Sequence, residues 1–158
     1  MKQPIRKNIV KSHKIRVKKS KPKKHKNKFG TSKLEIKFKE EFLDKLGINY
    51  IYQYEIESIE RTYDFYLPDS NLLIEVDGDY FHSNPMFYTE DKLTPTQKKN
   101  KRVDEYKNKW ALMHGIPILR IWEYDINNNP KKVMDMLKKH ININTKKMLF
   151  LEEKKKRH

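Results

Sequence analysis

The chain has 158 residues, which suits one domain with a tail, and its 36 Lys and Arg against 21 Asp and Glu give a formal net charge of +15. It contains no cysteine, which excludes disulfides and thiolate metal sites, and we expect no zinc site. No apolar run reaches the roughly 18 to 20 residues of a membrane span, and the charged start lacks the apolar stretch of a secretory signal. We therefore expect an intracellular protein without a membrane partner.

Most of the positive charge lies in residues 1–28. This segment has 13 Lys or Arg and no acid, whereas the other 130 residues carry 23 basic and 21 acidic side chains. Like charge without apolar residues predicts a segment that is disordered when free. It is either a solvated tail or an arm that neutralises DNA phosphates. We favour the arm, whose DNA-binding residues would be Arg16, Lys18, Lys19, Lys21, Lys23, Lys24, Lys26 and Lys28.

A domain is expected over residues 29–142, and its first element is a helix that ends at Gly47. Four apolar residues with helical spacing lie on one face of this helix: Leu34, Phe38, Phe42 and Leu46. Ser32, followed three residues later by Glu35, fits a capping box at its start.

Three strands are expected next. The segments "NYIYQYEIESI" and "RTYDFYLP" read as strands joined by a polar turn, and "PDSN" turns into a third strand, "LLIEVD". Because the connections are so short, we expect an antiparallel meander.

The second half of the domain reads as helix, strand and helix. We predict a loop over residues 83–95, a helix over 96–114, a buried parallel strand at "IPILRIW" and a last helix from Pro130, followed by a basic C-terminal tail over 143–158. The order α-β-β-β-α-β-α predicts an α/β fold with a mixed β-sheet flanked by helices.

Acidic residues interrupt the third strand and point to a metal site. Strand alternation places Glu75 and Asp77 on one face, and the preceding turn brings Asp64 near them. Converging carboxylates suit Mg²⁺, with Mn²⁺ as the alternative, and such an ion can promote displacement at a phosphodiester. The metal ligands would be Asp64, Glu75 and Asp77. The alternative is that these acids pair with the many lysines.

These residues resemble a known nuclease pattern. A strand Asp, a turn and then "IEVDG" resemble the restriction-endonuclease-like nucleases with a PD-(D/E)xK core, with Asp64 and Glu75 in the acidic positions. Asp77 stands where a lysine is usual. That departure fits better with the branch similar to very short patch repair endonucleases and the EDxHD homing endonucleases, including the small freestanding enzymes of cyanophages.

That branch has a helix Glu, a strand Asp, a variable position, a His and a later helix Asp. The chain has each in order, in "SKLEIKF", "YDFYLP", "IEVDG", "GDYFH" and "NKRVDEYKNKW". The resemblance covers about residues 31–126 and implies a restriction-endonuclease-like core. The catalytic residues that it implies are Glu35, Asp64, Asp77, His82 and Asp104.

The resemblance also implies roles for these residues. His82 would act as a general base on water or stabilise the leaving oxygen, and Asp104 would orient it. The alternatives are a surface histidine and an ordinary helical acid. Capping of the first helix is an alternative to a catalytic role for Glu35. Asp77 could bind the metal or tune the protonation of His82. Aromatic residues beside His82, such as Phe81, could enter DNA.

We therefore expect a Mg²⁺-dependent endonuclease for double-stranded DNA, of a homing type that nicks or cuts both strands. It would be a monomer or weak dimer, and phage- or mobile-element-encoded. The alternatives are a nucleic-acid-binding protein that has lost cleavage, and a nuclease directed to mismatches, junctions or RNA. The repair relatives look zinc-stabilised through cysteine, so the absence of cysteine counts against mismatch repair.

Overall fold

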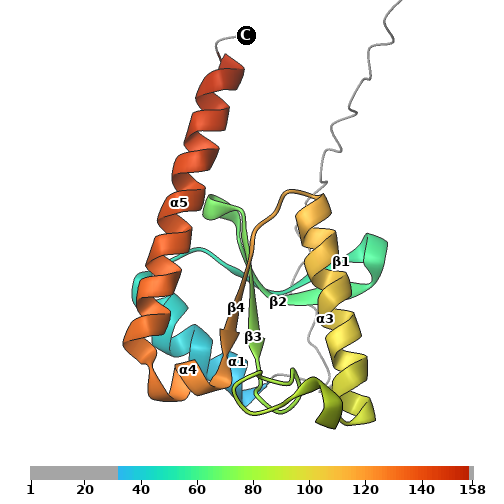
Figure 1. Cartoon of the computed structure of the whole chain (residues 1–158). Coiled ribbons are helices and arrows are strands. Elements are labelled where there is room, and N and C mark those ends of the chain that lie inside the picture. The colour runs from blue at the N-terminus through green and yellow to red at the C-terminus, as the bar shows by residue number, and fades with distance from the viewer. Residues whose placement is uncertain (1–31, 157–158) are drawn as a thin grey trace, which may run out of the picture. The chain divides into compact units, whose positions relative to one another are not determined.

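The computed structural model describes residues 32–156 (Figure 1). The predicted arm over residues 1–28 lies outside the described residues, and so does each of its predicted DNA-binding residues. Within the described part, no helix is both long and apolar enough to cross a membrane.

The domain is an α/β fold built on one mixed sheet of four strands. The strands are β1 (Ile51–Ile56), β2 (Arg61–Leu67), β3 (Leu72–Asp77) and β4 (Ile118–Trp122), and they lie side by side in that order. The pairs β1–β2 and β2–β3 are antiparallel, which confirms the predicted meander. β3 and β4 are parallel, because helix α3 (Pro95–Met113) connects them.

The first helix is divided by a π-helical turn. α1 (Lys33–Phe38) is followed by π residues Lys39–Leu43 and by α2 (Asp44–Leu46). Ser32 caps the start by accepting a hydrogen bond from the Leu34 amide, and Gly47 ends the helix with φ of 62°. The predicted capping box is wrong, because Ser32 binds the Leu34 amide in place of the Glu35 amide, and the Glu35 carboxylate accepts from Tyr52 and Gln53.

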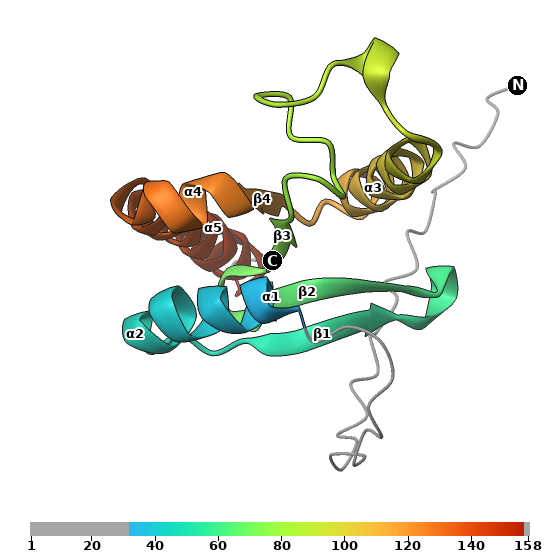
Figure 2. The same cartoon turned by 90° about the horizontal axis from the view of Figure 1, so that it is seen from below.

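The helices cover the two faces of the sheet. The larger core contains Phe38 and Phe42 from the first helix, Ile74 from β3 and Leu137 from α5 (Pro130–Lys156). α3 packs on the other face through Ala111, beside Tyr63 and Leu73. Figure 1 shows α5 and α3 on opposite sides of the β3–β4 pair, and Figure 2 shows the same arrangement from below.

Two helices differ from the sequence prediction. The short α4 (Glu123–Asn128) was not predicted, and it begins directly after β4. α5 runs on to Lys156, so the segment predicted as a separate tail from residue 143 is helical as far as it is described. No Gly or Pro interrupts it after Pro130, and its Lys, Met, Leu and Glu residues favour helix.

Phe65 is the residue on which we expect core stability to depend most clearly. It is fully buried, and its ring centroid lies 5.6 Å from that of Phe38 and 5.2 Å from that of Tyr52. Phe65→Ala should lower the free energy of unfolding by about 3–5 kcal/mol, measured by urea titration. Leu112→Ala, at a side chain that is 80% exposed, should change it by under about 0.5 kcal/mol. Equal effects would contradict the assigned core.

Candidate functional site

The site lies where β2 and β3 separate. Phe65, Tyr66 and Leu67 of β2 pair with Ile74, Leu73 and Leu72 of β3, and this pairing stops before Asp64. The other edge of β3 pairs with β4 from Leu73 to Asp77. At the point of separation Oδ2 of Asp64 accepts a hydrogen bond from the Val76 amide at 2.7 Å. A side chain therefore replaces a backbone partner, and Asp64 lies against the C-terminal part of β3.

An open cavity of about 360 Å³ lies at this separation. Three carboxylates from three different elements line it, namely Glu35 of α1, Asp64 of β2 and Glu75 of β3. His82 from the following loop and Lys107 from α3 are the basic side chains in its lining. We call this the acid pocket. The prediction that Asp64 and Glu75 come together is confirmed.

Glu35 is held toward the acid pocket by the edge strand. Its Oε2 accepts hydrogen bonds from the Tyr52 hydroxyl at 2.9 Å and from Nε2 of Gln53 at 2.6 Å. Gln53 has a φ of 52°, a left-handed conformation that is unusual for a residue within a strand. Burial, together with the negative charge of Asp64, raises the pKa of Glu35 to about 7.

The other two carboxylates are also shifted toward their neutral forms. Burial and the charge of Asp64 raise the pKa of Glu75 to about 8, although Lys107 opposes the shift. Burial raises the pKa of Asp64 as well, against the hydrogen bond from Val76. Burial is the largest cause of all three shifts, and the charge of Asp64 is the next for Glu35 and Glu75, so a cation held among these carboxylates would favour their ionised forms.

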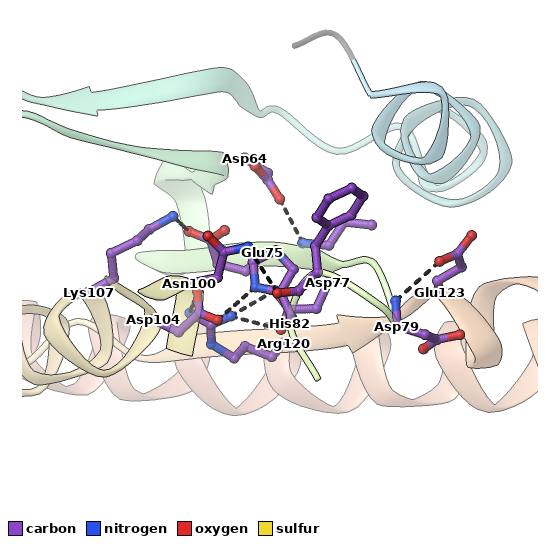
Figure 3. Close-up of polar contacts among 12 residues, drawn as sticks. Asp64, Glu75, Asp77, Asp79, His82, Asn100, Asp104, Lys107, Arg120 and Glu123 are labelled. Carbon is purple, nitrogen blue, oxygen red and sulfur yellow. Dashed lines mark hydrogen bonds and ion pairs between the residues drawn. The ribbon is translucent and has the colours of Figure 1, made fainter. Parts of the chain in front are cut away.

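A second group of charged residues lies beside the acid pocket (Figure 3). Arg120 of β4 donates from Nη1 to both Asp77 oxygens at 2.7 and 2.8 Å, and its Nη2 lies 3.3 Å from Oδ1 of Asp104. Nδ1 of His82 lies 2.7 Å from Oδ2 of Asp104 and 3.5 Å from Oδ1 of Asp77. We call these four residues the arginine cluster.

The predicted pairing of His82 with Asp104 is present in the arginine cluster. Burial lowers the pKa of His82, but the hydrogen bond to Asp104 and the charge of Asp77 outweigh it, so that pKa is raised overall. Burial opposes the ionisation of Asp104, yet the His82 hydrogen bond and the Arg120 charge hold its pKa below the usual value. Both shifts favour the ion pair.

Asp77 does not join Asp64 and Glu75 as the sequence predicted. It is the last residue of β3 and pairs with Trp122 of β4. Arg120, two residues before Trp122, donates to both oxygens of the Asp77 carboxylate. Asp77, His82 and Asp104 together form a cluster of atoms that could hold a metal ion. The predicted ligand set is thus divided between the acid pocket and the arginine cluster.

Helix α3 fixes the loop that carries His82. Gln97 donates to the Tyr80 carbonyl at 2.8 Å, Asn100 donates to the Phe81 carbonyl at 3.0 Å, and Asp104 binds His82 itself. Three consecutive loop residues therefore bind three successive turns of one helix. Lys107, one turn further along α3, contacts Glu75.

Sequence reasoning missed Gln97, Asn100, Lys107 and Arg120. A signal was present for the first three, because they share the spacing of Asp104 and put polar side chains along one stripe of a helix. Arg120 gave a weaker signal, as a single charged residue inside the apolar segment "IPILRIW". A charge at that position requires a partner.

The loop after β3 is also fixed at its other side. Oδ1 of Asp79 accepts from Asn84 at 2.7 Å and from the Tyr124 amide at 3.3 Å, while Glu123 accepts from the Asp79 amide at 3.1 Å. The loop nevertheless leaves large apolar side chains in solvent, each about half exposed or more: Tyr80, Phe81, Met86 and Phe87. Phe81 also lines the acid pocket.

Comparison with known proteins adds no family to this geometry. No protein-family model, no curated protein and no solved structure matched the chain. The assignment of a function therefore depends on the site itself.

The raised pKa of Glu35 predicts a pH-dependent cost in stability. Its folded-state pKa of about 7 exceeds the ordinary value of 4.5, so the folded protein binds the extra proton and loses stability as pH rises between those values. Glu35→Gln should therefore stabilise the metal-free protein by roughly 1–3 kcal/mol above pH 7 and by little below pH 4.5.

Urea unfolding in the presence of a chelator, at both ends of that pH range, measures the effect. Glu40→Gln, at an exposed position of the same helix, is the matched control and should show no such dependence on pH. A destabilisation by Glu35→Gln above pH 7 would contradict the assigned electrostatics.

Proposed function

We propose that the protein is a metal-dependent endonuclease that hydrolyses phosphodiester bonds in double-stranded DNA, on a restriction-endonuclease-like core. The observation that carries the proposal is the acid pocket, a single cavity that Glu35, Asp64 and Glu75 line from separate elements beside His82. Ordinary surface acids do not have raised pKa values of this size while lining one cavity. The sequence resemblance to EDxHD homing endonucleases supports the same reaction.

The donor set of the acid pocket fits Mg²⁺ or Mn²⁺. Its ligands are carboxylate oxygens, which hard divalent cations prefer. When ionised, its three carboxylates outnumber its one ammonium group, and His82 already pairs with Asp104, so a divalent ion would supply positive charge that the pocket lacks. The arginine cluster fits less well, because the guanidinium of Arg120 already contacts Asp77 and Asp104.

We therefore assign Asp64 and Glu75 as the principal metal ligands, with Glu35 as a further carboxylate for the ion or its water. A divalent ion held there would supply positive charge to the phosphate oxygens during the displacement. Asp77 would act through Arg120 and His82, as the residue that keeps both in position.

His82 is suited to donate a proton to the leaving oxygen. Asp104 holds its Nδ1, which leaves Nε2 for the substrate, and the same contact raises the pKa of His82 and favours the protonated ring. Of the two roles that the sequence leaves open, protonated His82 fits the stabilisation of the leaving oxygen better than the abstraction of a proton from water.

The surroundings of the acid pocket support DNA as the substrate. Exposed Phe81 stands at its edge, with Tyr80 at a ring-centroid distance of 5.2 Å, and aromatic faces of this kind stack on bases. We propose that residues 1–28 add affinity through the phosphates. The described domain has one such pocket, so a monomer would nick, and a double-strand cut would require a weak dimer or two successive nicks.

One observation favours a second candidate, a DNA-binding protein without cleavage. Arg120 and Lys107 already pair with Asp77 and Glu75, so part of the negative charge is compensated by the chain itself. This candidate predicts binding that persists without any divalent ion and no strand scission.

Conversion of supercoiled plasmid to nicked or linear DNA in Mg²⁺ tests the proposal. Asp64→Asn should lower the rate by at least about 10²-fold, because it removes a ligand charge from the pocket. His82→Ala should lower it by roughly 10²-fold, the usual contribution of a positioned acid. Asp135→Asn, at an exposed acid of α5, is the control and should cut at the parent rate.

Two results would count against the assignment. Parent-like cutting by Asp64→Asn and His82→Ala would place the active site elsewhere. Tight DNA binding by the parent protein without cutting, in both Mg²⁺ and Mn²⁺, would leave the second candidate.

Deletion of residues 1–28 tests the proposed arm. The segment carries 13 Lys or Arg, and each phosphate contact releases a counterion. The truncated protein should bind duplex DNA much more weakly, and its affinity should depend less steeply on salt concentration. Fluorescence anisotropy across a salt series measures both quantities. Unchanged affinity and slope would make the segment a solvated tail.

A further inference from the structure

Lys107 is buried in a place where a lysine is costly. It is 7% exposed, and among residues 32–156 no other lysine is buried. Lysines are almost never buried without a partner, because an ammonium group loses its hydration there. Its partner is Glu75, which its Nζ contacts inside the acid pocket.

The lysine is aimed at that carboxylate by two contacts with β2. Its Nζ lies 4.7 Å from the ring centroid of Tyr63, over the aromatic face, and the Tyr63 hydroxyl donates to the Lys107 carbonyl at 2.7 Å. Tyr63 is fully buried, so this arrangement is part of the packed sheet. The ammonium group is therefore held beside the acids by the fold itself.

A cation in this place has a specific electrostatic effect. When ionised, Glu35, Asp64 and Glu75 repel one another across the cavity. Of the lysines and arginines in residues 32–156, Lys107 is the one that lines this cavity. Arg120 cannot replace it, because its guanidinium binds Asp77 and Asp104 in the arginine cluster. Without Lys107 the cavity would hold three acids, and His82, which pairs with Asp104, would be its one remaining basic side chain.

We propose that the ammonium group of Lys107 binds the Glu75 carboxylate in the metal-free protein, in place of the divalent ion. When the ion binds, the ammonium group leaves this carboxylate. This inference rests on the proposed metal-binding function of the acid pocket. An ammonium group and a metal ion compete for the same Glu75 oxygens, so the lysine stabilises the metal-free protein and lowers its affinity for the ion. Once released, the ammonium group stays in the cavity, where it can bind an anionic oxygen of the DNA backbone.

Competition of this kind is measurable without DNA and without cleavage. The experiment is a calorimetric titration of the full chain with Mg²⁺, above the pKa of about 8 of Glu75 so that the carboxylate is ionised. Lys107→Met keeps an unbranched side chain, one atom shorter, and removes its charge, so it should bind Mg²⁺ roughly tenfold more tightly than the parent. Lys107→Arg keeps the charge and should not gain affinity.

Lys101→Met is the matched control. Lys101 lies on the same helix but pairs with Glu90 at the surface, so the same substitution should leave Mg²⁺ affinity unchanged. If Lys107→Met is folded and binds Mg²⁺ no more tightly than the parent, the inference is wrong, while the proposed metal site stands. If neither protein binds a divalent ion, the proposed function fails together with the inference.

A second measurement uses the parent protein, in case Lys107→Met does not fold. In a sample with isotope-labelled lysine, the side-chain NMR signal of Lys107 can be assigned by its loss in Lys107→Arg. Added Mg²⁺ should move this signal toward the positions of exposed lysines and leave the Lys101 signal in place. A Lys107 signal that does not move while Mg²⁺ binds would overturn the proposed release.

Discussion

The separation of β2 from β3 at Asp64 is the constraint on which the rest of the site depends. Where two strands stop pairing, backbone groups in the middle of a sheet lose their partners, and each must find another. The Asp64 side chain supplies one of these partners by accepting from the Val76 amide. The same separation opens the cavity that Glu35 and Glu75 line, while the other edge of β3 stays paired with β4. One interruption of a β-ladder therefore creates both the space and the ligands of the acid pocket.

Burying several carboxylates together has to be offset by positive charge, and the chain brings this charge from two elements that come later in the sequence. Arg120 on β4 takes the oxygens of Asp77, and Lys107 on α3 takes Glu75. Because the two cations approach from different elements, they divide the acids into two groups with different properties. The arginine cluster is balanced and firmly hydrogen-bonded, whereas the acid pocket keeps raised pKa values and open space. Burial costs of this kind are typical of sites where the fold gives up stability for chemistry.

Local sequence patterns predicted much of the fold and part of the site. The alternation in β3, the short turns of the meander and Pro130 at the start of α5 are local signals, and the structure has each of them. The contacts of Glu35 could not be predicted in this way, because Ser32 and Glu35 also match a capping box, and only the position of β1 decides between the two. The contacts of Asp77 likewise depend on Arg120, which lies 43 residues away in the chain. The parallel pairing of β3 and β4 brings the two residues together. Sequence spacing carries no information on such a pairing until the register is known.

Asp77 now has a different meaning from the one that the sequence suggested. In the nuclease pattern it stands at the position of a lysine, and a carboxylate there suggests lost activity. In the structure this carboxylate does not line the acid pocket and binds Arg120, which reaches Asp104 and so supports the partner of His82. A positively charged side chain still enters the acid pocket, but it comes from α3 as Lys107. A chain that had simply lost its chemistry would be expected to lose buried charges that cost stability, since apolar replacements of similar size are often neutral or stabilising. The three carboxylates, His82 and Lys107 that line the acid pocket, with the arginine cluster beside it, are the physical reason for which we propose a variant enzyme.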